Sequence, residues 1–227
     1  APDTPAAEEQ PDCISDPTTQ QLAAPVEAAM AQYPNEAKYT ASNGNFDSEK
    51  YGEDWDAWWE SYQEKTADMT DPATMTHWFT TSIPALMQDA GKENRVCSPL
   101  NIYMALSMLA AVTDGQTRQQ ILDALGAESL ELLQKQTAQL WTENSWDDGL
   151  VTSTLANSIW LRDGYNYNSE TLQKLGEDFY ASAFSGEMGS DAYNNMLRDW
   201  INEHTGNLLT EQASGLELAL SLIHISE

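Results

Sequence analysis

The apolar positions of residues 95–125 predict two consecutive helices, the first of which is buried. Ser98 suits the N-cap of the first helix, and Pro99 suits its first position, where the missing N–H costs nothing. Almost every position from residue 100 to 112 is apolar, so no polar face is left for solvent. The run is too short, and too interrupted by polar residues such as Asn101, to cross a membrane. It therefore predicts a helix at the centre of a sizeable domain.

A turn at residues 113–115 separates this helix from the second one. A capping-box pattern, formed by Thr117 and Gln120, predicts that the second helix starts at Thr117. Before the central helix, Val96 and Cys97 predict a short apolar strand, in which Cys97 is expected to be a buried and inert thiol. The remaining elements are expected to cover the central helix.

The rest of the chain contains more helical than strand patterns. Apolar residues recur at helical spacing in four segments, while alternating positions predict a strand with both faces covered. The order contains no βαβ repeat and no internal repeat, so it indicates the α+β class. The predicted elements are helices at 72–91 (kinked at Pro84), 128–144, 169–179 and 190–206, and strands at 150–161 and 183–185.

The N-terminal segment differs from the rest. Residues 1–45 are rich in Pro, Ala, Asp and Glu without sustained periodicity, and they resemble a tether. In the acidic stretch that follows, an aromatic stripe occupies one face of a predicted helix, because its residues are spaced i, i+3, i+4 and i+7. Two interpretations stay open: the stripe docks on the body of the protein, or it is a stacking platform for sugars or a partner peptide. The stripe consists of Trp55, Trp58, Trp59 and Tyr62.

The chain carries 36 acidic and 10 basic side chains, a net charge of −26. Such a surface repels nucleic acid and anionic membranes, and no apolar run is long enough for membrane insertion. Residues 1–75 hold 16 acids and 3 bases, hence −13, which indicates a boundary near residue 70. The chain starts at Ala1 without Met, with an opening typical of the tether after a removed bacterial export or lipoprotein signal. We therefore expect an extracellular or cell-surface protein, with a lipid anchor upstream of Ala1 as one form of attachment.

No group of residues predicts catalysis, a metal site or a cofactor. His77 and His204 are isolated, and the chain has no HExxH, GxSxG, phosphate-binding loop or dinucleotide motif. Two cysteines, Cys13 and Cys97, are too few for a disulfide framework or a zinc cluster. Carboxylates beside tryptophans could serve a glycosidase, but so acidic a segment brings such pairs together by chance. These carboxylates are Asp54, Asp56 and Glu60.

Five stretches, in this order and at this spacing, resemble the N-terminal part of a serpin, a family of serine protease inhibitors. The helix start Ser-Pro-Leu-x-Ile followed by x-Thr-x-x-Gln-Ile is fairly specific, and its combination with Ala-Asn-x-Ile-Trp is strong. The resemblance implies an α+β serpin fold, truncated after its N-terminal helices and the first strands of its main sheet. It divides the chain into an acidic extension at 1–70, a partial serpin domain at 71–219 and a tail at 220–227. The stretches are 94–102, 105–109, 115–121, 155–162 and 197–209.

In serpins the helix that begins with Ser-Pro lies beneath the main sheet, in the shutter region where that sheet parts. The resemblance therefore places Ser98, Pro99 and Leu106 in a shutter, with Asn101 in place of a small hydroxyl residue. Ordinary helix capping also accounts for Ser98. Two motifs depart from the family pattern: Gly-Ala-x-Gly after the helix reads Val-Thr-Asp-Gly here, and Ile-Asn-x-Trp reads Leu-Arg-Asp-Trp.

Serpins inhibit through a C-terminal reactive loop, which the target protease cleaves and which then inserts as a strand into the main sheet. Residues 1–227 contain no such loop. We therefore expect a monomeric fragment that inhibits no protease by itself and folds poorly, because its strands lack partners. Residues 220–227 equal the translation of a transposon-end adapter used in preparing sequencing libraries, so we expect a non-native tail and no role for His224. The alternative is a non-inhibitory serpin that binds a partner through the aromatic stripe.

Overall fold

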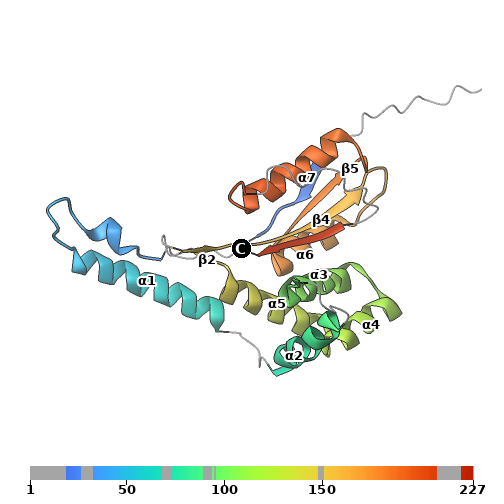
Figure 1. The fold of residues 1–227 in the computed structure, drawn as a ribbon, viewed down its shortest axis with the longest axis horizontal. Helices are drawn as coiled ribbons and strands as arrows, with labels where there is room; N and C mark the ends of the chain where they lie inside the picture. Colours follow the sequence, from blue (N-terminus) through green and yellow to red (C-terminus); the bar gives the residue numbers. More distant parts are fainter. Residues whose placement is uncertain are drawn as a thin grey trace, which may run out of the picture.

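The computed structural model describes residues 19–26, 33–67, 73–88, 94, 96–147, 151–208 and 221–226. In chain order the elements are β1 (Gln20–Ala23), the short 3₁₀ helix η1 (Glu36–Tyr39), α1 (Ser48–Thr66), α2 (Ala73–Met87), α3 (Pro99–Val112), α4 (Gly115–Leu125), α5 (Leu130–Asn144), β2 (Trp146–Asp147), β3 (Thr152–Ser153), β4 (Leu155–Arg162), α6 (Ser169–Phe179), β5 (Ala181–Gly186), α7 (Asp191–His204) and β6 (Ser221–Ser226). They form a sheet with helices on both sides, while α1 extends away from the rest (Figure 1).

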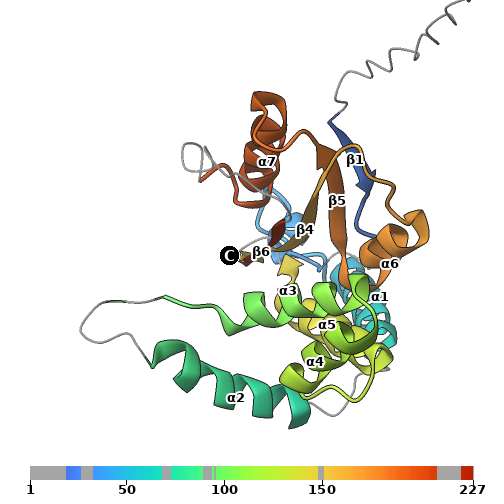
Figure 2. The same ribbon diagram turned by 90° about the vertical axis from the view of Figure 1, so that its right-hand side faces the viewer.

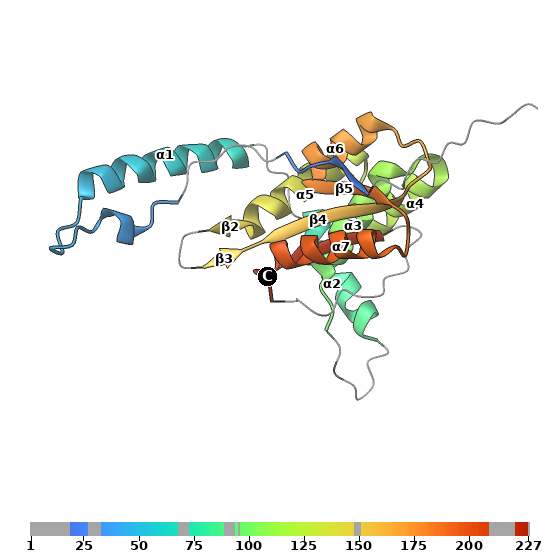
Figure 3. The same ribbon diagram turned by 90° about the horizontal axis from the view of Figure 1, so that it is seen from above.

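The main sheet has four strands in the order β1-β5-β4-β6. Its centre is the parallel pair of β4 and β5, in which Asn157 lies opposite Ala181 and Trp160 lies opposite Phe184. Helix α6 connects these two strands, because a parallel pair requires a crossover. β1 and β6 pair antiparallel with β5 and β4 respectively, and so form the two edges. A separate two-stranded ribbon of β2 and β3 leads into β4 (Figure 3).

Helices cover both faces of β4 and β5, as the apolar strand pattern predicts. On one face, Ile159 and Leu161 pack with Met108 of α3 and with apolar residues of α6. On the other face, Trp160 packs with Phe184 and with residues of α7. The alternation follows the two-residue period of a strand. Figures 1 and 2 show α7 and the layer of α2, α3, α4 and α5 on opposite sides of the sheet.

A second core lies between α2, α3, α4 and α5. Tyr103 and Met104 of α3 have no exposed surface, and Trp78 of α2 meets the Tyr103 ring edge-on at 5.2 Å between centroids. Because α3 also contacts α6 and β6, it is the helix around which the other elements are arranged. The predicted buried central helix is therefore confirmed.

Helix α2 occupies the middle of the helix predicted at 72–91. Pro84 lies inside it, as expected, and the predicted ends at 71–72 and 91 lie outside the described residues. Neither α2 nor any other helix in the described part of the chain is long and apolar enough to cross a membrane.

Several boundaries differ from the prediction; the strand expected at 183–185, for example, runs over Ala181–Gly186. Helix α4 begins at Gly115 rather than at Thr117, because Asp114 is its N-cap and the Asp114 carboxylate accepts a hydrogen bond from the Gly115 amide at 2.7 Å. The single strand predicted at 150–161 is divided, because Ser153 belongs to the β2–β3 ribbon and β4 begins only after it.

The strand predicted at Val96 and Cys97 is wrong. None of the described strands pairs with this segment, so it belongs to neither described sheet. The Cys97 thiol is exposed instead of buried. Val96 is fully exposed and lines an apolar hollow of about 310 Å³ together with Ile83 and Leu86 of α2.

Part of the stretch predicted as a tether contributes a strand to the sheet. In the pairing of β1 with β5, Gln20 lies opposite Ser185. Beyond β1, the Val26 amide donates a hydrogen bond to the Gly176 carbonyl of α6 at 2.9 Å. Leu22 packs against the apolar core between α6 and β5. Residues 19–26 are therefore attached to the folded body, whereas residues 1–18 lie outside the described part.

Candidate functional site

The N-terminal end of α3 holds most of the residues that the resemblance places in the shutter. Ser98 is the N-cap: its Oγ accepts a hydrogen bond from the Asn101 amide at 3.3 Å and donates one to the Asn101 Oδ1 at 2.6 Å. Pro99 takes the first helical position. Leu106 lies further along the helix, half-buried against the core of α2, α3, α4 and α5. The structure thus brings Ser98, Pro99 and Asn101 into one turn and separates Leu106 from them.

The outer edge of β4 is paired with β6. In this antiparallel ladder Leu155 lies opposite Ser226, and Asn157 lies opposite His224. Helix α3 contacts β6 as well, so the position next to β4 also lies against the central helix. β6 therefore occupies the position beside β4 and lies against α3.

Two polar side chains of β4 are buried in the sheet. Asn157 of β4 is 1% exposed, and its Nδ2 donates a hydrogen bond to the carbonyl of the last residue of α6 at 2.7 Å. Ser158 has no exposed surface, and its Oγ accepts a hydrogen bond from the Trp160 Nε1 at 2.9 Å. Both of these polar groups thus have a hydrogen-bond partner. The Ser158 partner lies two residues away on the same strand, whereas the Asn157 partner comes from α6.

Tyr193 anchors α7 to the sheet. Its hydroxyl lies 2.8 Å from the carbonyl oxygen of Leu161 and 3.1 Å from that of Phe184, one on β4 and the other on β5. Its ring lies against Gly186, where a Cβ would come within 2.7 Å of the ring. Burial raises the pKa of the Tyr193 phenol far above its ordinary value, because the phenolate would lose its hydration. The helical stripe predicts the buried ring, and a buried Tyr hydroxyl usually has a partner.

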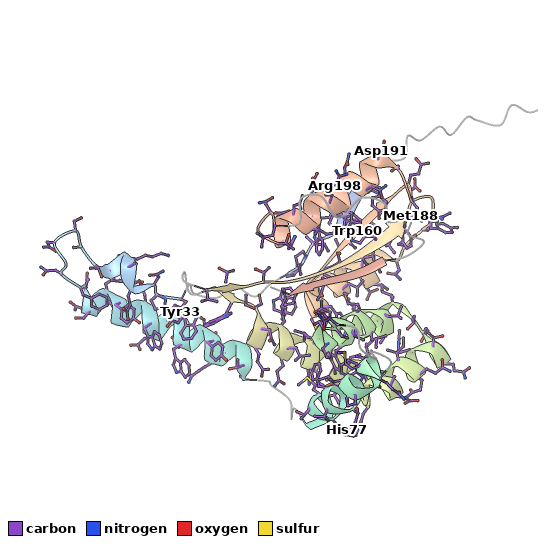
Figure 4. All side chains as sticks on the ribbon, viewed as in Figure 1. Tyr33, His77, Trp160, Met188, Asp191 and Arg198 are labelled. Atoms are coloured by element: carbon purple, nitrogen blue, oxygen red, sulfur yellow. The ribbon has the colours of Figure 1, made fainter. Side chains whose placement is uncertain are left out.

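Aromatic stacking adds to this anchor. Trp160 stacks on Phe184 with centroids 4.3 Å apart and planes 17° apart, and it meets Trp200 of α7 edge-on at 6.3 Å. Figure 4 shows Trp160 between α7 and the strands. Helix α7 therefore lies across this face of the sheet.

A second candidate surface is an aromatic cluster on α1 and the segments before it. Trp58 stacks on Tyr62 at 5.5 Å, and Trp59 stacks on the same ring at 5.8 Å. Tyr33 meets Trp55 and Trp58 edge-on at 5.7 and 5.0 Å. The α1 aromatic cluster consists of Tyr33, Tyr39, Phe46, Tyr51, Trp55, Trp58, Trp59 and Tyr62.

The rings that contact this cluster come from its own segment, and α1 also contacts α5 of the body. Docking of the stripe on the body therefore stays one of the two interpretations. Figures 1 and 3 show α1 extending away from the sheet, alongside η1. The Tyr39 hydroxyl donates a hydrogen bond to the Asp54 carboxylate at 2.6 Å, which raises the pKa of Tyr39 to about 12. Trp59 is 46% exposed and Phe46 is 44% exposed. The cluster is thus internally ordered and still open to solvent.

The two histidines that sequence reasoning set aside do not meet. His77 is exposed on α2, whereas the Nδ1 of His204 lies 2.7 Å from the Trp200 carbonyl oxygen and its ring stacks on the Trp200 ring. Among the described residues, no group of three or more His, Cys, Asp or Glu side chains could hold a metal ion.

A sequence model of the family described as Serpin (serine protease inhibitor) matches residues 77–223, more than half of the chain. The chain belongs to the serpin family. Among curated relatives, mouse neuroserpin is 28% identical over 144 residues, which cover 62% of this chain and 35% of neuroserpin. Bovine alpha-2-antiplasmin is 29% identical over 154 residues, which cover 64% of this chain and 30% of the relative. The chain thus spans about a third of the length of these curated serpins.

Solved serpin structures share the fold. Arabidopsis AtSerpin1, in a native stressed conformation, matches with a TM-score of 0.57 and 19% identity over 72% of this chain and 42% of that chain. A thermophilic serpin, Tengpin, in the native state, matches with a TM-score of 0.52 and 24% identity over 60% of this chain and 35% of that chain. These likenesses confirm the predicted partial α+β serpin fold. The predicted boundary between residues 70 and 71 stays a prediction.

Proposed function

We propose that this chain is the N-terminal part of a serpin-type inhibitor that acts on serine proteases, with cysteine proteases as a second class of target. In the mechanism that the family implies, the protease cleaves a reactive loop, and the loop enters the main sheet as a new strand. The observations that support the proposal are the serpin family match over residues 77–223 and the position of α3, whose Met108 packs against Ile159 and Leu161 of β4. In serpins the helix that begins with Ser-Pro lies beneath the main sheet, where that sheet parts.

The shutter assignment of Ser98, Pro99, Asn101 and Leu106 belongs to this proposal. Three of these residues lie in the first turn of α3, where the Ser98–Asn101 hydrogen bonds hold the helix start. The same helix contacts β6 at the sheet edge. Helix α3 would then be the support on which the main sheet moves when the cleaved loop enters it.

We further propose that the chain by itself is inactive. The reactive loop of a serpin lies in its C-terminal part, and this chain spans about a third of the length of the curated serpins that it matches. Residues 1–70 would be an acidic extension, 71–219 the partial serpin domain and 220–227 a non-native tail. The intact protein would be monomeric and exported to the cell surface or the medium. Its macromolecular partner would be the target protease.

Formation of a covalent complex tests the proposal. The protein encoded by the intact gene and this chain are each incubated with a panel of serine and cysteine proteases and examined on SDS gels. We expect an SDS-stable complex from the intact product and none from this chain. Proteases whose active sites have been blocked provide the control. A complex formed by this chain would contradict its inactivity, and an intact product that forms none across the panel would contradict inhibition.

A second candidate function is binding through the α1 aromatic cluster, in a serpin that does not inhibit. The observation in its favour is the exposure of Trp59 and Phe46 in a cluster whose other rings hold each other in place. Rings fixed in this way lose little conformational freedom when a ligand binds. The two functions are separable, because one needs the main sheet and the other needs α1.

A further inference from the structure

Trp59 presents the most open tryptophan ring of the α1 aromatic cluster. Its side chain is 46% exposed, whereas Trp55 and Trp58 are half-buried. Tyr62 stacks on it at 5.8 Å with an angle of 21° between planes, and Trp58 lies 6.0 Å away. A large flat ring is thus held at a fixed orientation with part of its surface in solvent.

The helix face beside this ring is acidic. Asp56, Trp59, Glu60 and Gln63 are spaced i, i+3, i+4 and i+7, so they share one face of α1, and all of them are exposed. Within the described residues, the ion pairs lie at α4, α5 and α6, and none involves an α1 carboxylate. The carboxylates of α1 are Glu49, Glu53, Asp54, Asp56, Glu60 and Glu64, against two lysines in the same helix.

An exposed indole bordered by carboxylates suits a cation better than any other ligand. An arginine guanidinium can lie flat on a tryptophan ring through a cation–π contact while its N–H groups bond a carboxylate. The net charge of −26 on the whole chain adds long-range attraction for a basic partner. A neutral sugar could stack on the Trp59 ring, but it would gain no electrostatic attraction from the negative charge of the chain.

We infer that the face of α1 formed by Trp59, Asp56 and Glu60 binds a basic, arginine-containing peptide segment of a partner protein. The arginine stacks on the Trp59 ring, and its N–H groups donate to the carboxylates of Asp56 and Glu60. This inference rests on the second candidate function and names its ligand. It does not depend on protease inhibition.

The test uses the protein encoded by the intact gene and a fluorescently labelled peptide of alternating arginine and glycine, with binding followed by anisotropy. Peptides of alternating serine and glycine, and a neutral oligosaccharide, are measured in parallel. We expect saturable binding of the arginine peptide only, and we expect the affinity to fall as salt is added, because exposed charges are screened. Circular dichroism shows whether each variant keeps its helices.

Two matched pairs of variants separate this face from the general negative charge. Trp59→Ala should weaken binding by about fivefold, because the cation–π contact is lost. Trp146→Ala removes a ring that is 51% exposed on β2 and should leave binding unchanged. Asp56→Asn with Glu60→Gln should weaken binding, whereas Glu128→Gln with Glu187→Gln neutralises two exposed carboxylates in loops away from α1 and should not.

Equal effects within either matched pair would overturn the inference, since binding would then depend on overall charge or on tryptophan content. Binding of the oligosaccharide instead of the arginine peptide would also overturn it and would leave the second candidate function standing. If no probe binds, both this inference and the second candidate function are refuted, while the proposed protease inhibition is unaffected.

Discussion

A Cβ atom at Gly176 would lie 2.3 Å from the carbonyl oxygen of Ala24, closer than side chains approach a backbone in proteins. Gly176 lies on α6, and Ala24 follows β1 directly. Two residues later the Val26 amide donates a hydrogen bond to the Gly176 carbonyl at 2.9 Å. The absent side chain therefore allows the N-terminal segment to lie against α6 and to add a strand to the sheet.

Replacing this glycine should detach the segment. We expect Gly176→Ala to lower the free energy of unfolding by about 1–3 kcal/mol, because the methyl group and the Ala24 carbonyl cannot both keep their places. Hydrogen exchange of residues 20–26 should accelerate as β1 leaves β5. Because this chain is expected to fold poorly alone, the stability variants are compared in the protein encoded by the intact gene.

Gly52→Ala is the matched control for this prediction. Gly52 is also helical, and a Cβ there would meet nothing within 4 Å. Its replacement should be neutral or stabilising by up to about 1 kcal/mol, the ordinary gain for a helical Gly→Ala change. If Gly176→Ala stabilised the protein as much as Gly52→Ala, the contact between β1 and α6 would be refuted.

Tyr193→Phe should loosen α7 from the sheet. The change removes the hydroxyl that reaches the carbonyls of Leu161 and Phe184 and leaves the ring in place. We expect a loss of about 1–2 kcal/mol in the free energy of unfolding, measured by urea titration, since a buried acceptor loses its donor. Tyr165→Phe, at a ring that is 65% exposed, should change it by less than about 0.5 kcal/mol. Similar losses from both variants would argue against the anchor.

Alkaline pH should destabilise the fold through its buried tyrosines. Burial raises the pKa of Tyr103 and of Tyr193 well above the ordinary value of about 10. The folded chain therefore keeps these protons where the unfolded chain releases them. Their contribution is complete below about pH 10 and is lost as the pH rises from there toward the folded pKa values. Urea titrations between neutral and alkaline pH should show this decline, and Tyr103→Phe should make it shallower. If the unfolding free energy of the Tyr103→Phe variant declined with pH as steeply as that of the parent protein, the buried Tyr103 would not be a cause of the decline.

Ser98→Ala tests whether Ser98 does more than cap α3. Its Oγ accepts from the Asn101 amide, and the Ser129 Oγ accepts from the Leu132 amide at the start of α5 in the same way. Each replacement should cost about 1 kcal/mol of unfolding free energy. If Ser98 also belongs to a shutter, Ser98→Ala should in addition change the rate of protease inhibition by the intact product, whereas Ser129→Ala should not. If the Ser98→Ala and Ser129→Ala variants inhibit the protease at equal rates, Ser98 acts only as the N-cap of α3.

The elements with a strong period were the ones that the sequence predicted well. The helix that begins after Ser98 is apolar on nearly all sides, which predicts its burial. The apolar stripe of α7 is wide enough to predict which face of the helix packs on the sheet. Family motifs added the order of elements and the partial serpin fold, both of which the structural relatives confirm.

Features that depend on a distant partner were missed. β1 is four residues with two glutamines, so its pattern is weak, and it exists because β5 offers a free edge. Cys97 was expected to be buried because it adjoins an apolar helix, yet no described strand pairs with its segment. The aromatic spacing of α1 predicted one face, but the rings that cover it, such as Tyr33, come from before the helix.

The central claim is that the main sheet of the intact protein takes up its cleaved loop as an added strand. The most direct measurement is the thermal unfolding midpoint of the intact product before and after a single cleavage in the reactive loop. A loop that inserts adds a full ladder of hydrogen bonds and buries apolar surface, so we predict a clear rise in the midpoint after cleavage. An unchanged or lower midpoint would contradict inhibition by strand insertion and favour a binding protein with a serpin fold.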